Sequence, residues 1–184
     1  MSTDLSTDLS TDHPTRPRPT LRDLAGRAPA APGPGALLHA TAGSIAVLLL
    51  LVAAGALLHQ PMLIPPLAAS ATLVHSSPTL PLSQPRSVIG GHFLGALTGF
   101  AVLAGLGHSA WAAALAGGLA LAVMMITRTP HSPATATAVI VVLQAPPAPR
   151  FLILLAAATV LLVLAGVAAA RARPGAPAYP AYWW

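Results

Sequence analysis

Long apolar runs alternate along the chain with short segments that are rich in proline and polar residues. Four runs approach the ~20 residues that an α-helix needs to cross a bilayer, with the third at the short end of the range. They cover residues 36–58, 88–106, 111–127 and 151–170. Two shorter apolar pieces, at 66–74 and 133–141, lie between the long runs and begin at prolines. The pattern predicts an all-α, polytopic integral membrane protein with four long transmembrane helices and two short, Pro-initiated helices.

The two short pieces resemble each other, which predicts two similar halves. When residues 66–74 are aligned with residues 133–141, a proline, two alanines and a valine coincide, and Ser70 matches Thr137. Each half then consists of a long, a short and a long helix, and paired interrupted segments mark the binding site in many transporters. At ~1.5 Å per residue, thirteen residues reach about 20 Å, less than the ~30 Å hydrocarbon core. This length suits broken or re-entrant helices, but complete crossings stay open.

The composition excludes a soluble globular protein and several kinds of chemistry. Of the 184 residues, 55% are hydrophobic and 7% are charged, whereas a soluble domain carries about a quarter charged residues. There is no cysteine, so disulfides, thiolate metal sites and cysteine nucleophiles are excluded. The last acidic residue is Asp23, which leaves the apolar runs without a carboxylate. We therefore expect no enzyme, no metal site and no cofactor, and a cation site is disfavoured.

The charges indicate membrane topology rather than nucleic-acid binding. The net charge of +5 comes from arginines, and arginines that flank apolar runs favour the cytoplasmic side of the membrane. With a cytoplasmic N-terminus and four crossings, Arg86, Arg128 and Arg150 all fall outside; with six crossings, only Arg150 does. The preference of arginines for the cytoplasmic side therefore favours six segments, and six segments place both termini in the cytoplasm. We expect the protein in a prokaryotic cytoplasmic (inner) membrane.

The chain divides into three regions. Residues 1–35 carry a Ser-Thr-Asp-Leu repeat and then proline, arginine, alanine and glycine without an apolar period. This composition predicts a disordered cytoplasmic tail. Residues 36–170 form the transmembrane domain. Residues 171–184 form a C-terminal tail that is either an interfacial anchor or a segment without a role, and its aromatic residues are Tyr179, Tyr182, Trp183 and Trp184.

Residues 127–133 form a polar stretch between two apolar segments, and ionisable groups at such a depth indicate a functional site. Pro133 suits the first turn of a new helix and Ser132 its N-cap. The following N–H groups would be unpaired at the positive end of the helix dipole, and Arg128 suits a planar oxyanion. The further donors are Thr129, His131 and Thr135. The stretch thus predicts a small-anion site, unless Arg128 only marks a helix end and Ser132 is an ordinary cap.

A second polar cluster, at residues 83–92, opens the second long run. His92 lies one turn inside this run, where it either makes a helix–helix hydrogen bond or relays protons. The small residues Gly91, Gly95 and Gly99 recur at every fourth position. This spacing predicts close helix packing.

At these two clusters the sequence resembles the HPP family of integral membrane proteins. The family pattern Thr-Arg-Thr-x-His-Pro-Pro-Ala-x-Ala-Thr-Ala corresponds to residues 127–138, with Ser132 in place of the first motif proline. The pattern Gln-Pro-Arg-x-x-x-Gly-Gly-His is intact at residues 84–92. A Gly-Ala-Ser-Ala segment corresponds to residues 68–71, with Ala68 in place of the glycine. The resemblance covers roughly residues 58–170, and the paired motifs in order make it specific.

The resemblance implies a membrane domain, and some family members, in chloroplasts and cyanobacteria, transport nitrite. We therefore expect a transporter or channel for a small monovalent anion, with nitrite as the leading candidate. Arg128 and the helix start at Pro133 would bind the oxyanion, Arg86 would serve the matching site, and His92 or His131 would carry a coupled proton. The full set of substrate-binding candidates is Arg128, Thr129, His131, Ser132, Thr135, Arg86, His92 and Ser70.

The expected partners are a nitrite-like inorganic anion, the lipid bilayer and, because the helices form a thin wall, further copies of the same chain. Nucleic acid is not an expected partner. The alternative is a non-transporting membrane scaffold or assembly protein in which the same motifs only lock the helices together.

Overall fold

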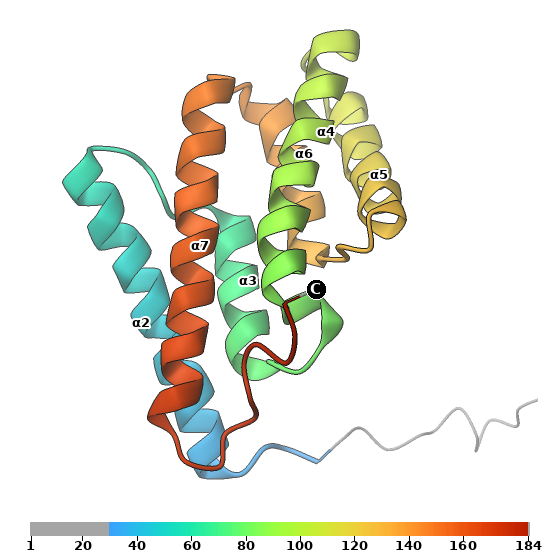
Figure 1. Cartoon of the computed structure of the whole chain (residues 1–184). Helices are drawn as coiled ribbons and strands as arrows, with labels where there is room; N and C mark the ends of the chain where they lie inside the picture. Colours follow the sequence, from blue (N-terminus) through green and yellow to red (C-terminus); the bar gives the residue numbers. More distant parts are fainter. Residues whose placement is uncertain (1–29, 184) are drawn as a thin grey trace, which may run out of the picture. The chain divides into compact units, whose positions relative to one another are not determined.

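The structure is a computed structural model that describes residues 30–183, and most of the predicted N-terminal tail lies outside the described residues. Within them every regular element is a helix, so the all-α prediction is confirmed (Figure 1). The helices are α2 (Pro34–Leu58), α3 (Pro65–Ser76), α4 (Gly91–Leu106), α5 (Ala110–Ile126), α6 (Ser132–Gln144) and α7 (Ala148–Ala172). A 3-10 turn, η1 (Pro81–Ser83), and a π-helical turn, η2 (Arg86–Gly90), precede α4.

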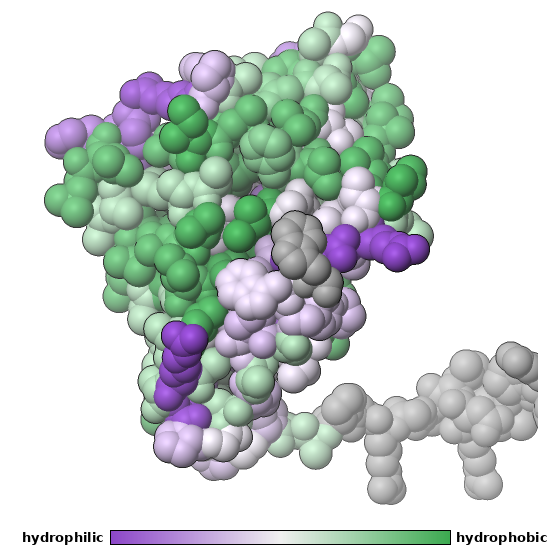
Figure 2. All heavy atoms as spheres, in the orientation of Figure 1, coloured by the Kyte–Doolittle hydropathy of each residue, from purple (hydrophilic) through white to green (hydrophobic). Residues whose placement is uncertain are grey.

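Three of these segments are long and apolar enough to cross a membrane: α2, Arg86–Leu106 and α7. The helices α5 and α6 are apolar but have only 17 and 13 residues. The number of crossings therefore stays a prediction. Hydrophobic residues cover most of the upper part of the face shown in Figure 2, and hydrophilic ones form isolated patches. Such a surface suits lipid rather than water.

Successive helices reverse direction along the chain (Figure 1). At one end, Arg86 Nη2 donates to the Thr127 carbonyl at 3.0 Å, which joins the segment before α4 to the end of α5. At the other end, His108 Nε2 donates to the Leu143 carbonyl of α6 at 2.7 Å. We call these the Arg86 end and the Arg150 end of the bundle. Because α4 and α5 are joined by a tight turn, they are antiparallel neighbours (Figure 1).

The glycines of α4 allow its backbone to approach α6 closely. A Cβ atom at Gly95 would collide with the Ala134 carbonyl, and one at Gly99 would lie 2.7 Å from the Ala138 oxygen. Helices can come this near only where side chains are absent. The predicted close packing is confirmed, and it holds the start of α6 against α4.

The C-terminal tail folds back onto the bundle. Tyr179 is buried, and its ring fills the space that Gly166 of α7 leaves beside Val74 of α3. Burial raises the pKa of the Tyr179 hydroxyl above its usual range. The buried amide oxygen of Gln84 accepts from the N–H groups of Ala181 at 2.9 Å and Tyr182 at 3.4 Å. Tyr179 is thus a packing residue, which neither of the two expectations for the tail foresaw, because a glycine in α7 gives its ring a place inside the bundle.

Candidate functional site

The connection from α5 to α6 begins with a tight helix-ending turn. The Thr129 N–H bonds to the Met124 carbonyl at 2.9 Å and the Arg128 N–H to the Met125 carbonyl at 3.2 Å. This pair of bonds is the Schellman motif, in which glycine usually occupies the left-handed position. Here Arg128 occupies it, with φ of 56°. The conformation costs a non-glycine residue roughly 1–2 kcal/mol, and His59 and Ala145 adopt it as well.

Arg128 and Arg86 line the same pocket, which has a volume of about 490 Å³. Arg128 is exposed, and Arg86 is half-buried with one guanidinium nitrogen bonded to the Thr127 carbonyl. The other lining residues are Pro81, Ser87, Met125, Pro130 and Tyr182. The side chains that line the pocket bring two positive charges and no Asp or Glu, since none occurs after Asp23. The pocket therefore attracts anions.

A buried chain of hydrogen bonds lies beside this pocket. Ser70 Oγ of α3 is 2.8 Å from Nε2 of both His92 and His131. Nδ1 of His92 is 2.7 Å from Thr137 Oγ1 of α6, and Nδ1 of His131 is 2.7 Å from the Leu82 carbonyl oxygen. The four side chains are at most 1% exposed. The cluster joins α3, α4 and α6 where they meet.

The Leu82 carbonyl determines the direction of every bond in the neutral cluster. Because a carbonyl only accepts, His131 Nδ1 must carry a proton, and neutral His131 Nε2 must accept. Ser70 then donates its hydroxyl proton to His131, and Ser70 Oγ accepts from His92 Nε2–H. His92 Nδ1 is left as an acceptor for the Thr137 hydroxyl. Every side-chain polar atom of the cluster of Ser70, His92, His131 and Thr137 then has a hydrogen-bond partner, and the cluster has no net charge, as a buried site requires.

Thr137 was not among the site residues predicted from the sequence, although the signal was present. The internal alignment pairs Ser70 with Thr137, and in the structure these two hydroxyls bond to opposite nitrogens of the same His92 ring. The matched positions of the two halves therefore meet at one imidazole. This contact explains why a hydroxyl recurs at that place in both short helices.

The start of α6 differs from the prediction. The helix begins at Ser132, and the N-cap is His131, whose φ of −150° is extended. Ser132 is exposed, so it is neither the cap nor a buried donor. The reason is that Pro133 fits the second helical position as well as the first, since both lack an intrahelical N–H bond.

The other predicted donors near α6 have local partners. The Ala134 N–H bonds to the His131 carbonyl at 2.9 Å, and the Thr135 hydroxyl donates to the Ser132 carbonyl at 2.7 Å. Thr129 Oγ1 is 2.8 Å from Thr127 Oγ1. The structure thus separates the predicted residues into the arginine pocket and the histidine cluster. Thr129, Ser132 and Thr135 do not line the pocket or bond to the cluster.

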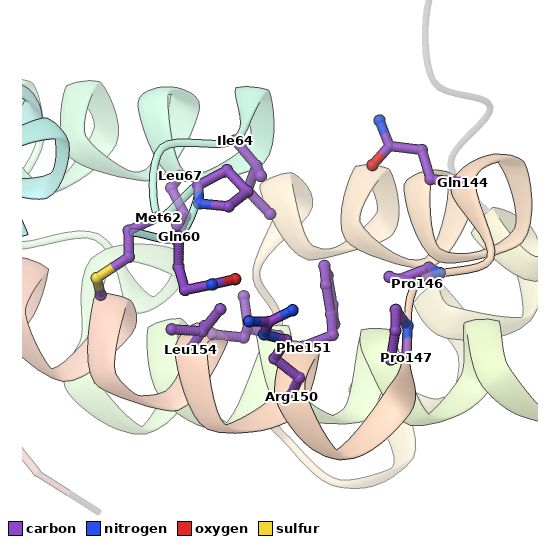
Figure 3. Close-up of a pocket in the computed structure, with 12 residues that line it drawn as sticks. Gln60, Met62, Ile64, Leu67, Gln144, Pro146, Pro147, Arg150, Phe151 and Leu154 are labelled. Atoms are coloured by element: carbon purple, nitrogen blue, oxygen red, sulfur yellow. The ribbon is translucent and has the colours of Figure 1, made fainter. Parts of the chain in front are cut away.

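A second arginine-lined pocket, of about 310 Å³, lies at the opposite end of α6. Arg150 and Gln60 reach toward each other in it (Figure 3). Most of its remaining wall is apolar, with Gln144 as a further polar residue: Pro61, Met62, Ile64, Leu67, Pro146, Pro147, Phe151, Leu154 and Leu155. Leu67 is one helical turn from Ser70, and Pro130 of the first pocket is next to His131. Along the helices, the histidine cluster therefore lies between the two pockets.

These features define a helical integral membrane protein with two arginine-lined pockets and a buried histidine pair. The family model of the HPP transmembrane region matches residues 29–180, and the chain belongs to this family. A transmembrane protein from Dictyostelium discoideum is 36% identical over 132 residues, which is 67% of this chain and 46% of the relative. A second transmembrane protein of that organism is 33% identical over 126 residues, 64% of this chain and 40% of the relative. No solved structure matches the chain.

Proposed function

We propose that this protein is a transporter or channel for a small monovalent anion, with nitrite as the leading candidate. The observation that carries the proposal is that two arginines 42 positions apart, Arg86 and Arg128, line one pocket. A guanidinium matches a planar oxyanion through two parallel N–H bonds. Nitrite has this shape, and the family resemblance favours it over other small oxyanions.

The second pocket supports the proposal, because it would provide an exit for the anion at the other end of the bundle. The pockets lie at opposite ends of α6, and a 13-residue helix is about 20 Å long. The short helices α3 and α6 run in opposite directions, so each half of the chain would be an inverted copy of the other (Figure 1). Inverted halves with short helices at their interface are typical of transporters that open alternately to either side.

The arginines also support an orientation. Four of the five described arginines, Arg86, Arg128, Arg171 and Arg173, belong to the Arg86 end, and Arg150 alone belongs to the other. Gly35, at the start of α2, lies beside Arg173. Positive residues favour the cytoplasm, so the Arg86 end would face it and both termini would be cytoplasmic. The protein would lie in a prokaryotic inner membrane, act without enzymatic chemistry and assemble as a homo-oligomer.

Nitrite uptake into proteoliposomes tests the proposal. We expect uptake by the wild type and a loss of roughly tenfold or more in Arg128→Ala and Arg86→Ala, because a charged hydrogen bond contributes about 1.5–3 kcal/mol. Arg171→Ala is the matched control, since it removes the same charge at an exposed position in the last turn of α7. Uptake that is equal in Arg128→Ala and the wild type would contradict the site assignment.

The alternative function is a membrane scaffold. It is supported by the hydrogen bonds of Ser70 and His92, which tie α3, α4 and α6 together. A scaffold predicts that Ser70→Ala lowers the unfolding temperature or the oligomeric state, and that wild-type proteoliposomes take up no more nitrite than empty ones. The uptake measurement therefore decides between the two functions.

A further inference from the structure

The cluster of Ser70, His92 and His131 has two fully hydrogen-bonded arrangements that differ by one proton. In the neutral arrangement, Ser70 donates to His131 Nε2. Ser70 Oγ also lies 3.0 Å from the Pro66 carbonyl oxygen, which can accept the hydrogen bond from the serine hydroxyl in place of His131. Ser70 Oγ would then accept from both Nε2 atoms, each 2.8 Å away, and His131 would carry a proton on each ring nitrogen. The added proton finds a partner without any change in helix packing.

A second added proton is opposed by the first. The rings of His92 and His131 are 4.9 Å apart between centroids, so two imidazolium ions would repel each other strongly. No Asp or Glu occurs after Asp23 to offset the charge. The geometry therefore suits a site that holds one proton.

We propose that this cluster takes up one proton with each anion, so that transport is proton-coupled and moves no net charge. The inference rests on the proposed transport function and names its driving ion. The cluster and the arginine pocket adjoin through Pro130 and His131, which are consecutive residues. An anion held by Arg86 and Arg128 reduces their repulsion of a proton on His131. The bound anion therefore raises the affinity of the cluster for a proton, and by reciprocity the proton raises the affinity of the pocket for the anion by the same factor.

Among residues 30–183 no Asp or Glu side chain surrounds the cluster, so a bound anion would add a negative charge beside it. Titratable and charged side chains on the elements that pack around the cluster are all neutral or positive. They are His39 on α2, His75 on α3, Arg86 on η2, Arg128 before α6, Arg150 and Arg171 on α7, and Tyr179 and Tyr182 in the tail. The helices α5 and α6 carry none. The protonated cluster and the bound anion therefore stabilise each other.

The proton balance of one cycle is simple. A proton from water enters on one side and binds His131 Nε2, while the Ser70 hydroxyl turns from His131 to the Pro66 carbonyl. On the other side the proton leaves His131 for water, and the Ser70 hydroxyl turns back. One negative and one positive charge cross together, and no oxidant or reductant takes part.

Proteoliposomes with a trapped pH-sensitive dye test this inference, with empty liposomes measured alongside to subtract leakage of nitrous acid. A nitrite gradient imposed on wild-type protein should acidify the lumen by one proton per nitrite. The rate should not change when the membrane potential is clamped with potassium and valinomycin. Ser70→Ala keeps both histidines but removes the shared oxygen, so the ratio of protons to nitrite should fall roughly fivefold or more.

The control is Thr72→Ala, which removes an exposed hydroxyl from the same helix that bonds only to the Ala68 carbonyl. This variant should keep the wild-type ratio. If Ser70→Ala does not fold, Thr137→Ser, which keeps the hydroxyl on His92, should preserve coupling and Thr137→Val should reduce it. Nitrite uptake without proton uptake, or uptake that follows the membrane potential, overturns the inference and leaves the transport function standing. Absence of nitrite uptake overturns both.

Discussion

Arg128 combines an unfavourable backbone conformation with a side chain that lines the anion pocket. Replacing it by glycine and by alanine separates these two properties, because both variants lose the guanidinium and only glycine tolerates the positive φ. We expect Arg128→Gly to be more stable than Arg128→Ala, while both lose nitrite uptake. This order is the reverse of the usual one in helices, where glycine is less favourable than alanine by about 1 kcal/mol.

The size of the effect follows from the turn geometry. Alanine at position 128 would keep φ near 56° because the bonds to Met124 and Met125 hold the turn. The left-handed conformation costs roughly 1–2 kcal/mol for a residue with a Cβ. Glycine loses about 0.4–1 kcal/mol more chain entropy on folding. The difference leaves Arg128→Gly ahead by about 0.5–1 kcal/mol.

Unfolding of the detergent-solubilised protein in increasing sodium dodecyl sulfate, followed by helical circular dichroism, measures this difference. The matched control is Ala145→Gly, because Ala145 ends α6 with φ of 43° and is exposed. It should gain a similar amount of stability and keep wild-type uptake. If Arg128→Ala is at least as stable as Arg128→Gly, the turn argument fails. If Arg128→Gly transports at the wild-type rate, the arginine is not part of the anion site.

The remaining predictions concern packing. Gly99→Ala should lower the free energy of unfolding by about 1–3 kcal/mol, because its Cβ would meet the Ala138 carbonyl. The control is Gly105→Ala, on the same helix with open space around it, which should be neutral or stabilising. If both variants lose the same stability, the close approach of α4 to α6 is contradicted. Gln84→Ala should expose the tail to protease and cost about 1–3 kcal/mol, because the buried amide oxygen that receives the Ala181 N–H is lost. A tail that stays protected would refute this anchor.

Much of the fold follows from local patterns in the sequence. Apolar runs predict helices because lipid leaves the backbone no other way to pair its polar groups. Prolines place the starts of the short helices, and the predicted short pieces at 66–74 and 133–141 fall within α3 and α6. The repeated hydroxyl at Ser70 and Thr137 is also visible in the alignment of the halves. The apolar runs and the helix starts depend on residues that are close together in the sequence, so they can be read from the sequence alone.

Only the tertiary structure decided which polar groups meet. Ser70 and His131 are 61 residues apart, and His92 and Thr137 are 45 apart, yet both pairs are in hydrogen-bond contact. Such contacts depend on how far each helix is rotated and shifted along its axis, which the packing of all helices sets together. A shift of one residue in the start of α6 sufficed to leave Ser132 exposed and to make His131 the cap. The sequence thus identifies the candidate residues, and the packing of the helices divides them into an arginine pocket and a histidine cluster.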